Sequence, residues 1–168
     1  YYARDIPGRR KSHDVGLRAQ VGHAAPDDHL LMIQGPLGID WNKRRYGVVP
    51  GIENADLTGR RPPTLLRFES WLKTGVHVAG RPNWVFVKLH THGCKDSNID
   101  MLLGAPMQDF HSALAGWDRS NPRCRYHYVT AWEMARLVHE AERNGTVDNV
   151  LGSQASIRTA PEPATLPS

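Results

Sequence analysis

The sequence has little of what several classes of protein require. It contains only two cysteines among 168 residues, Cys94 and Cys124, too few for a disulfide scaffold or a zinc ribbon. No apolar run approaches the roughly 18 residues that a membrane-spanning helix needs, and no signal peptide opens the chain. We therefore expect neither a disulfide-stapled domain nor a membrane span, and the compartment stays open.

The sequence also lacks an initiator methionine and starts abruptly at Tyr1-Tyr2. This start indicates a fragment or a processed product, so a targeting signal could have been lost upstream. What remains is long enough for one domain with a real core and too short for two. Its composition, 40% hydrophobic and 23% charged, is that of an ordinary globular protein.

Positive charge is in modest excess, with a net charge of +4. Much of the excess lies in three short clusters, at residues 9–11, 43–45 and 60–61. Arginine forks match planar anions, so these clusters could hold phosphates or acidic sugars; the alternative is solvated loop charge. No basic stripe is interleaved with aromatic residues, and we predict no nucleic-acid binding.

Alternating apolar and polar residues predict a β-rich N-terminal portion. Residues 15–21 alternate with the period of a half-buried strand, and residues 30–34 read as a more buried strand. Residues 38–61 are predicted to be irregular because glycine, proline and asparagine interrupt them.

Strand and helix patterns alternate in the second half of the chain. A helix is predicted to begin at Pro62-Pro63 and to end at Gly75, and residues 84–89 predict a strong strand. A looser helix follows over residues 98–115, with a break or kink at residues 104–106.

The last strand–helix unit carries the clearest local signal. Residues 123–129 predict a strand, and Thr130 with Glu133 matches a capping box that opens a helix ending at Asn144-Gly145. Helical crossovers of this length predict that strands 85–89 and 125–129 are parallel in one α/β sheet, either as neighbours or separated by at most one strand. Residues 1–151 are expected to form part of one barrel-like domain, and residues 152–168 a disordered tail.

Two histidines follow the strand predicted at residues 84–89. His90 and His92 flank Thr91 and precede Gly93, at the end of the strand where parallel sheets bind ligands. Imidazole transfers protons near neutral pH and binds metals. We take His90 and His92 as candidate catalytic residues; the alternative is structural histidines bonded to the backbone.

Two polar loops are weaker candidates for substrate binding. One holds His13 and Asp14, and the other holds Glu53 and Asp56. These side chains are polar enough to line a cleft, but they are equally typical of ordinary surface loops.

The order of motifs in the second half resembles the C-terminal end of polysaccharide deacetylases. The residues that carry this likeness are VFVKLHTHG, followed by a helix, a strand, YVTAWEM and a second helix, over residues 84–135. The phrases YYARD, KSHDVG, LMIQGPLGIDW, MLLGAPM and RYHYVTAWEM extend the likeness over about residues 1–145, to bacterial deacetylase-like or glycoside hydrolase/deacetylase-type barrels.

The resemblance implies a metal-dependent hydrolase that removes N- or O-acetyl groups from a polysaccharide or oligosaccharide, with His90 protonating the leaving group. It also implies a divalent metal, zinc or similar. The family's Asp-Asp strand end and its H-x-x-x-H pair are both missing here. We therefore expect the isolated chain to be inactive and to bind metal weakly.

Two rivals to the deacetylase hypothesis remain open. One is a metal-dependent phosphoesterase or amidohydrolase, in which a similar LHTH strand end opens the barrel rather than lying near its C-terminus. The other is a non-catalytic carbohydrate-binding barrel that uses the same cleft without metal.

Overall fold

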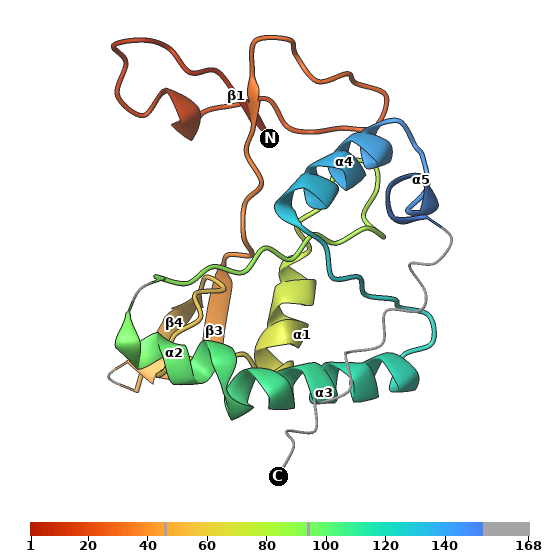
Figure 1. Cartoon of the computed structure of the whole chain (residues 1–168). Helices are drawn as coiled ribbons and strands as arrows, with labels where there is room; N and C mark the ends of the chain where they lie inside the picture. Colours follow the sequence, from red (N-terminus) through yellow and green to blue (C-terminus); the bar gives the residue numbers. More distant parts are fainter. Residues whose placement is uncertain (46, 94, 153–168) are drawn as a thin grey trace.

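Two hydrophobic cores, rather than one continuous sheet, organise the computed structural model, which describes residues 1–45, 47–93 and 95–152. The upper core in Figure 1 is built around α4 (Ala131–Glu142), and the lower core lies between α1 (Leu65–Thr74) and α3 (Ala105–Ser120). Most of the tail predicted for residues 152–168 falls outside the described residues. The fold is mixed α/β, and no barrel closes within the part of the chain that is described.

The first of two small antiparallel sheets bears out one of the strands predicted in the N-terminal portion. β1 (Tyr2–Ala3) pairs with β2 (Leu30–Leu31), inside the second predicted strand. The strand predicted over residues 15–21 is reduced to isolated bridges, from Leu17 to Tyr2 and from Gln20 to Ala79.

The second sheet corrects the prediction that residues 38–61 are irregular. β3 (Gly38–Arg45) and β4 (Val49–Glu53) form a hairpin that turns at Gly47, whose φ of 76° lies in the left-handed region. Pro50 is one of the residues that favour irregular structure in the prediction. Proline is nevertheless compatible with a strand that has one free edge, as β4 has in this two-stranded sheet.

The helices follow the sequence closely. α1 is capped by the Thr64 hydroxyl, which accepts a hydrogen bond from the Arg67 amide, and ends at Gly75 with a φ of 63°. The predicted break in the next helix is Gly104, which separates α2 (Asp96–Leu103) from α3.

α4 has the capping box predicted from Thr130 and Glu133. The short α5 (Asp148–Leu151) and the single-turn helix η1 (Ser12–Asp14) complete the set. None of the described helices is long and apolar enough to cross a bilayer.

The strands predicted at 84–89 and 125–129 are not formed, so they are not parallel neighbours in a sheet. Residues 84–89 are extended but make no ladder, and their side chains divide between the cores: Trp84 and Phe86 join the upper core, whereas Val87 and Leu89 join the lower one. In the second segment, Val129 packs against the upper core and Tyr126 against the lower core. An apolar run buried on both sides predicts a buried strand, but packing between two cores produces the same pattern.

The helix caps give a first prediction. Thr130→Ala removes the hydroxyl that accepts from the Glu133 amide, so the free energy of unfolding should fall by about 1 kcal/mol, with a similar loss for Thr64→Ala. Urea denaturation measures both. Ser120→Ala, at the exposed end of α3, is the matched control and should change stability by less than about 0.5 kcal/mol. Equal losses in all three variants would contradict the capping assignment.

Candidate functional site

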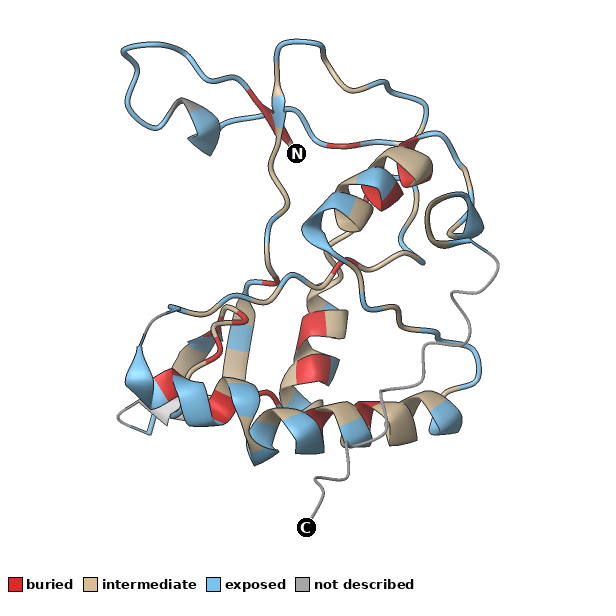
Figure 2. Cartoon of the chain, viewed as in Figure 1, coloured by how far each residue is buried: buried red, intermediate tan, exposed pale blue. Residues whose placement is uncertain are grey.

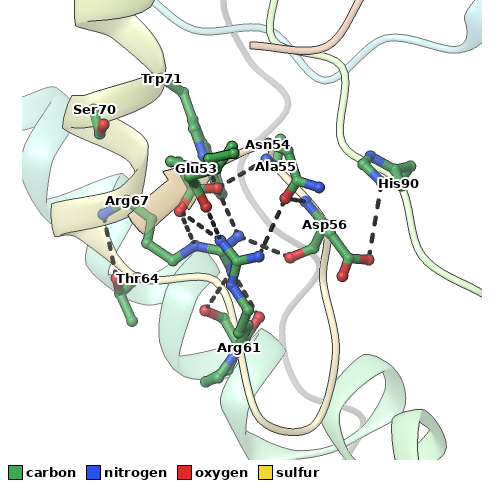
Figure 3. A network of polar contacts seen from close by, with 12 residues as sticks. Glu53, Asn54, Ala55, Asp56, Arg61, Thr64, Arg67, Ser70, Trp71 and His90 are labelled. Carbon is green, nitrogen blue, oxygen red and sulfur yellow. Dashed lines mark hydrogen bonds and ion pairs between the residues drawn. The ribbon is translucent and has the colours of Figure 1, made fainter. Parts of the chain in front are cut away.

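A buried carboxylate, Glu53, fastens β4 to α1. Its side chain is 3% exposed and meets the Arg67 guanidinium in a two-pronged pair, with Nε–Oε2 at 2.9 Å and Nη2–Oε1 at 2.8 Å. Trp71 Nε1 and the Ala55 amide also donate to Oε1, and Arg61 Nη2 donates to Oε2 (Figure 3). Glu53 therefore holds together residues from β4, the loop after it and α1.

The Arg67 guanidinium, like the Glu53 carboxylate, makes several hydrogen bonds within the protein. Its remaining N–H groups donate to the backbone carbonyls of Arg61, Pro62 and Asp56, at 2.7–2.9 Å. A buried guanidinium is tolerated when its donors are satisfied in this way. Arg67 thus ties the loop at residues 56–62 to α1.

The surroundings of Glu53 strongly favour its charged form. Burial alone would raise the pKa of this carboxyl, but hydrogen bonds from Arg67, Trp71 and the Ala55 amide outweigh burial and lower the pKa from 4.5 to about 2. Glu53 is thus placed beside the candidate site as its anchor, and its oxygens are engaged by protein donors.

Asp56 and His90 meet to one side of this anchor (Figure 3). The two residues form a parallel bridge, in which the Leu57 amide donates to the His90 carbonyl at 2.8 Å and the His90 amide donates to the Ala55 carbonyl at 3.3 Å. The His90 Nε2 lies 3.9 Å from the Asp56 Oδ1 (Figure 3). The sequence-predicted residues Asp56 and His90 are therefore brought together from segments 34 residues apart.

The Asp56 carboxylate oxygen that faces His90 is buried and accepts no hydrogen bond within the described structure. At 3.9 Å the pair is an ion-pair contact and is too long for a hydrogen bond. The His90 side chain is 44% exposed, so one face of the imidazole is open to solvent. The Asp56 carboxylate therefore lies near the imidazole and leaves part of the ring accessible to solvent.

Backbone strain accompanies the Asp56–His90 pair. Ala55 is fully buried and adopts a φ of 59°, which costs an alanine roughly 1–2 kcal/mol. The Ala55 amide is held at 2.8 Å by Glu53. The anchor thus imposes the unfavourable conformation that presents Asp56 to His90, and strain of this kind is typical of functional sites.

The turn after His90 is fixed by the buried Asn98 of α2. The Asn98 amide nitrogen donates to the His92 carbonyl at 3.1 Å and to the Thr91 hydroxyl, and its oxygen accepts from the Gly59 amide. The Thr91 hydroxyl in turn donates to the Leu57 carbonyl at 2.7 Å. The His92 side chain itself is exposed.

A broad cleft opens on the other side of Asn98. Its volume is about 1130 Å³, and it runs between the loop at residues 58–60 and the junction of α2 with α3. Arg60 and Lys95 supply positive charge to its lining, whereas His90 does not line it. The cleft and the histidine turn therefore share a wall.

His13 and Asp14 lie elsewhere. Both are exposed in η1, with His13 Nε2 3.7 Å from Asp14 Oδ1, in the N-terminal loop at the upper left of Figure 1. The β3–β4 hairpin occupies the lower left. The structure thus gathers Glu53, Asp56, His90 and the backbone of His92, and leaves this pair outside.

Sequence reasoning missed Arg67, Trp71 and Asn98. Arg67 and Trp71 are four residues apart, so they share a face of α1. Ser70 and Thr74 lie on the same face and make it look like an ordinary polar face, so the sequence carries no signal of the buried partner. The role of Asn98 depends on its contact with Gly59, which is far away in the sequence, and no local sequence pattern predicts that contact.

The gathered residues do not fit a catalytic zinc ion. Within residues 1–45, 47–93 and 95–152, no three His, Cys, Asp or Glu side chains could hold one metal ion together. Catalytic zinc takes three protein ligands, and among the described residues the site brings together Asp56 and His90 alone. Comparisons of the chain with protein-family models, curated proteins and solved structures gave no match.

The Glu53 anchor gives a second prediction. Because its pKa is lowered in the folded state, the charge contributes stability above about pH 4.5, and this contribution is lost as the pH falls toward 2. The loss should be about 3 kcal/mol, at about 1.4 kcal/mol per pKa unit. Urea denaturation at a series of pH values measures it.

Glu53→Gln is the control for this pH dependence. It should flatten the slope between pH 4.5 and 2 and cost about 3–5 kcal/mol near neutral pH, because Arg67 is left without its charge partner. Adding Arg67→Met should restore part of that loss. An unchanged acid slope in Glu53→Gln would contradict the assignment.

Proposed function

We propose that this chain is the portion of a polysaccharide deacetylase-like hydrolase that supplies the proton-donating histidine, His90. The observation that carries the proposal is the pairing of a solvent-open imidazole with a buried, otherwise unbonded carboxylate oxygen, His90 Nε2 to Asp56 Oδ1 at 3.9 Å. The motif order over residues 84–135 supports it. The barrel-like fold of that family belongs to the same proposal.

The chemistry asked of His90 is protonation of a leaving group. As the bond from the acyl carbon to the sugar nitrogen or oxygen breaks, the leaving atom gains electron density and needs a proton. A cationic imidazole supplies that proton and becomes neutral. Asp56 Oδ1 lies 3.9 Å from His90 Nε2, within ion-pair distance.

The cleft that shares Asn98 with the histidine turn suits an extended substrate. It is open and large enough for more than one sugar unit, and Gly59, Thr58 and Asn98 bring polar groups to its wall. Asn98, which lines the cleft, also binds the turn at residues 91–92, although none of residues 90–93 lines the cleft itself. The substrate class we propose is therefore an acylated polysaccharide or oligosaccharide.

The metal of such a hydrolase would need ligands outside the described residues, because Asp56 and His90 form no three-ligand set. Our third prediction is that the chain alone binds zinc, cobalt or nickel weakly or not at all. Titration calorimetry measures this affinity. A stoichiometric submicromolar zinc site would contradict the prediction and favour the phosphoesterase hypothesis.

The fourth prediction concerns His90 in the complete protein that carries this chain. His90→Ala should lower kcat for deacetylation by roughly 10²–10⁴-fold, the usual contribution of a general acid. Bound metal and Tm should change little, because the side chain is exposed at the end of an extended segment. Acetate release, metal content and thermal denaturation are measured on one preparation.

Metal content, stability and one control variant separate the possible roles of His90. Loss of metal together with rate would identify a ligand, and loss of about 1–3 kcal/mol of stability with normal activity would identify a structural histidine. His92→Ala is the matched variant and should have a much smaller effect, since Asp56 faces His90. Full deacetylase activity in His90→Ala would end the proposal, and sugar binding without any turnover in the wild type would favour the carbohydrate-binding barrel.

A further inference from the structure

The loop before α1 contains a tight turn that is closed by two hydrogen bonds. The Thr58 amide donates to the Arg61 carbonyl at 3.2 Å, and the Arg61 amide donates back to the Thr58 carbonyl at 2.9 Å. The Gly59 amide donates to Asn98 Oδ1, and a side chain at Gly59 would collide with the Ser97 carbonyl oxygen. Glycine permits this close approach, so the turn lies tightly against the start of α2.

Two adjacent arginines of this turn have different roles. Arg61 is used within the protein, because its guanidinium donates to Asn54 Oδ1, to the Ile52 carbonyl and to Glu53 (Figure 3). Arg60 is exposed, and its guanidinium has no hydrogen bond or ion pair within the described residues. Arg61 thus holds the turn in place, and the Arg60 guanidinium stays available to a ligand of the cleft that it lines.

Lys95, the N-cap residue of α2, brings a second cation to the same cleft. Its ammonium group likewise has no partner in the part of the chain that the structure describes. Asp100 is the one acidic residue of the described lining. The lining also includes two hydroxyl-bearing residues and a set of aliphatic ones: Thr58 and Ser97, then Ile99, Met101, Leu103, Ala105 and Pro106. These groups together suit a ligand that carries negative charge, hydroxyl groups and apolar surface.

We propose that the cleft selects an acidic sugar chain, one that contains hexuronic acid units, and that Arg60 recognises their carboxylates. A guanidinium pairs with a carboxylate through two parallel hydrogen bonds, and Lys95 adds a second positive charge without that directionality. Asp100 accepts hydrogen bonds from sugar hydroxyls, and the aliphatic lining contacts the C–H faces of the rings. This inference rests on the proposed function, because it names the class of polysaccharide on which the His90 hydrolase acts.

Other ligands use less of this lining. A nucleotide or a single-stranded nucleic acid relies on aromatic side chains for base stacking, and none of the described lining residues is aromatic. Inorganic phosphate would engage the cations but not the aliphatic side chains. A neutral sugar chain would leave Arg60 and Lys95 without partners. A carboxylated sugar chain uses the charged, hydroxyl and aliphatic groups together.

Titration calorimetry of the whole chain tests the inference without any turnover. The chain should bind a short oligogalacturonate and should not bind the fully methyl-esterified form, in which the same sugar chain carries no charge. Added salt should weaken the binding, because it screens the attraction between the charges. Neither probe needs an acetyl group or a metal, so the result does not depend on deacetylation.

Variants of the two cations locate the binding. Arg60→Gln should lower the affinity for oligogalacturonate roughly tenfold, the usual value of a hydrogen bond between charged groups, and Arg60→Lys should lower it less. Lys95→Gln should cost roughly threefold, as for an exposed ion pair. Arg10→Gln removes another exposed arginine, in the N-terminal loop, and is the matched control that should change the affinity by less than about twofold. Circular dichroism checks that each variant is folded.

The outcomes separate this inference from the proposed function. Equal binding of the esterified probe, an equal loss in Arg10→Gln, or no effect of Arg60→Gln would overturn the acidic-sugar assignment and leave the role of His90 standing. Tighter binding of inorganic phosphate or of an oligonucleotide, lost in Arg60→Gln, would assign the cleft to a different anion. Oligogalacturonate binding that is retained in His90→Ala, with no acetate release by the complete wild-type protein, would keep the ligand and contradict the hydrolase. If both hold, Arg60→Gln should raise KM by more than it lowers kcat, whereas His90→Ala should lower kcat.

Discussion

The ion pair between Glu53 and Arg67 is the contact on which the rest of the lower half depends. It joins β4 to α1, holds the Ala55 amide and, through the Arg67 donors, fixes the carbonyls of the following loop. A buried pair is weak evidence of net stabilisation, because desolvation opposes the attraction between the charges. The ion pair instead fixes the position of the hairpin. A two-stranded hairpin is marginally stable by itself, and the contact between Glu53 and Arg67 determines where this hairpin lies against α1.

The same contact explains how a strained residue persists beside the candidate site. Ala55 in the left-handed region presents Asp56 to His90, and nothing in the local sequence favours that conformation. Hydrogen bonds from the buried network to both sides of Ala55 supply the compensation. Stability in the interior and geometry at the surface are therefore coupled through Glu53, Ala55 and Asp56. Glu53 accepts a hydrogen bond from the Ala55 amide, and its partner Arg67 donates to the Asp56 carbonyl.

Local signals predicted the helices, and long-range contacts decided everything else. Thr130 with Glu133, and Thr64 with Gly75, mark helix ends by chemistry contained within a few residues, so α4 and α1 could be found from sequence. Residues 84–89 carry a pattern that reports burial on two sides but not what covers them. For the site, the turn containing His90 was visible in the sequence, whereas its pairing with Asp56 depends on a backbone bridge between segments far apart. Arg67 was overlooked for the same reason.

The hairpin reverses the usual relation between polarity and burial. The side that meets α1 is held by a charged pair and hydrogen bonds, whereas Ile39, Trp41 and Ile52 are exposed to solvent. Because ionic contacts fasten the hairpin to α1, these apolar side chains are not needed to hold it there.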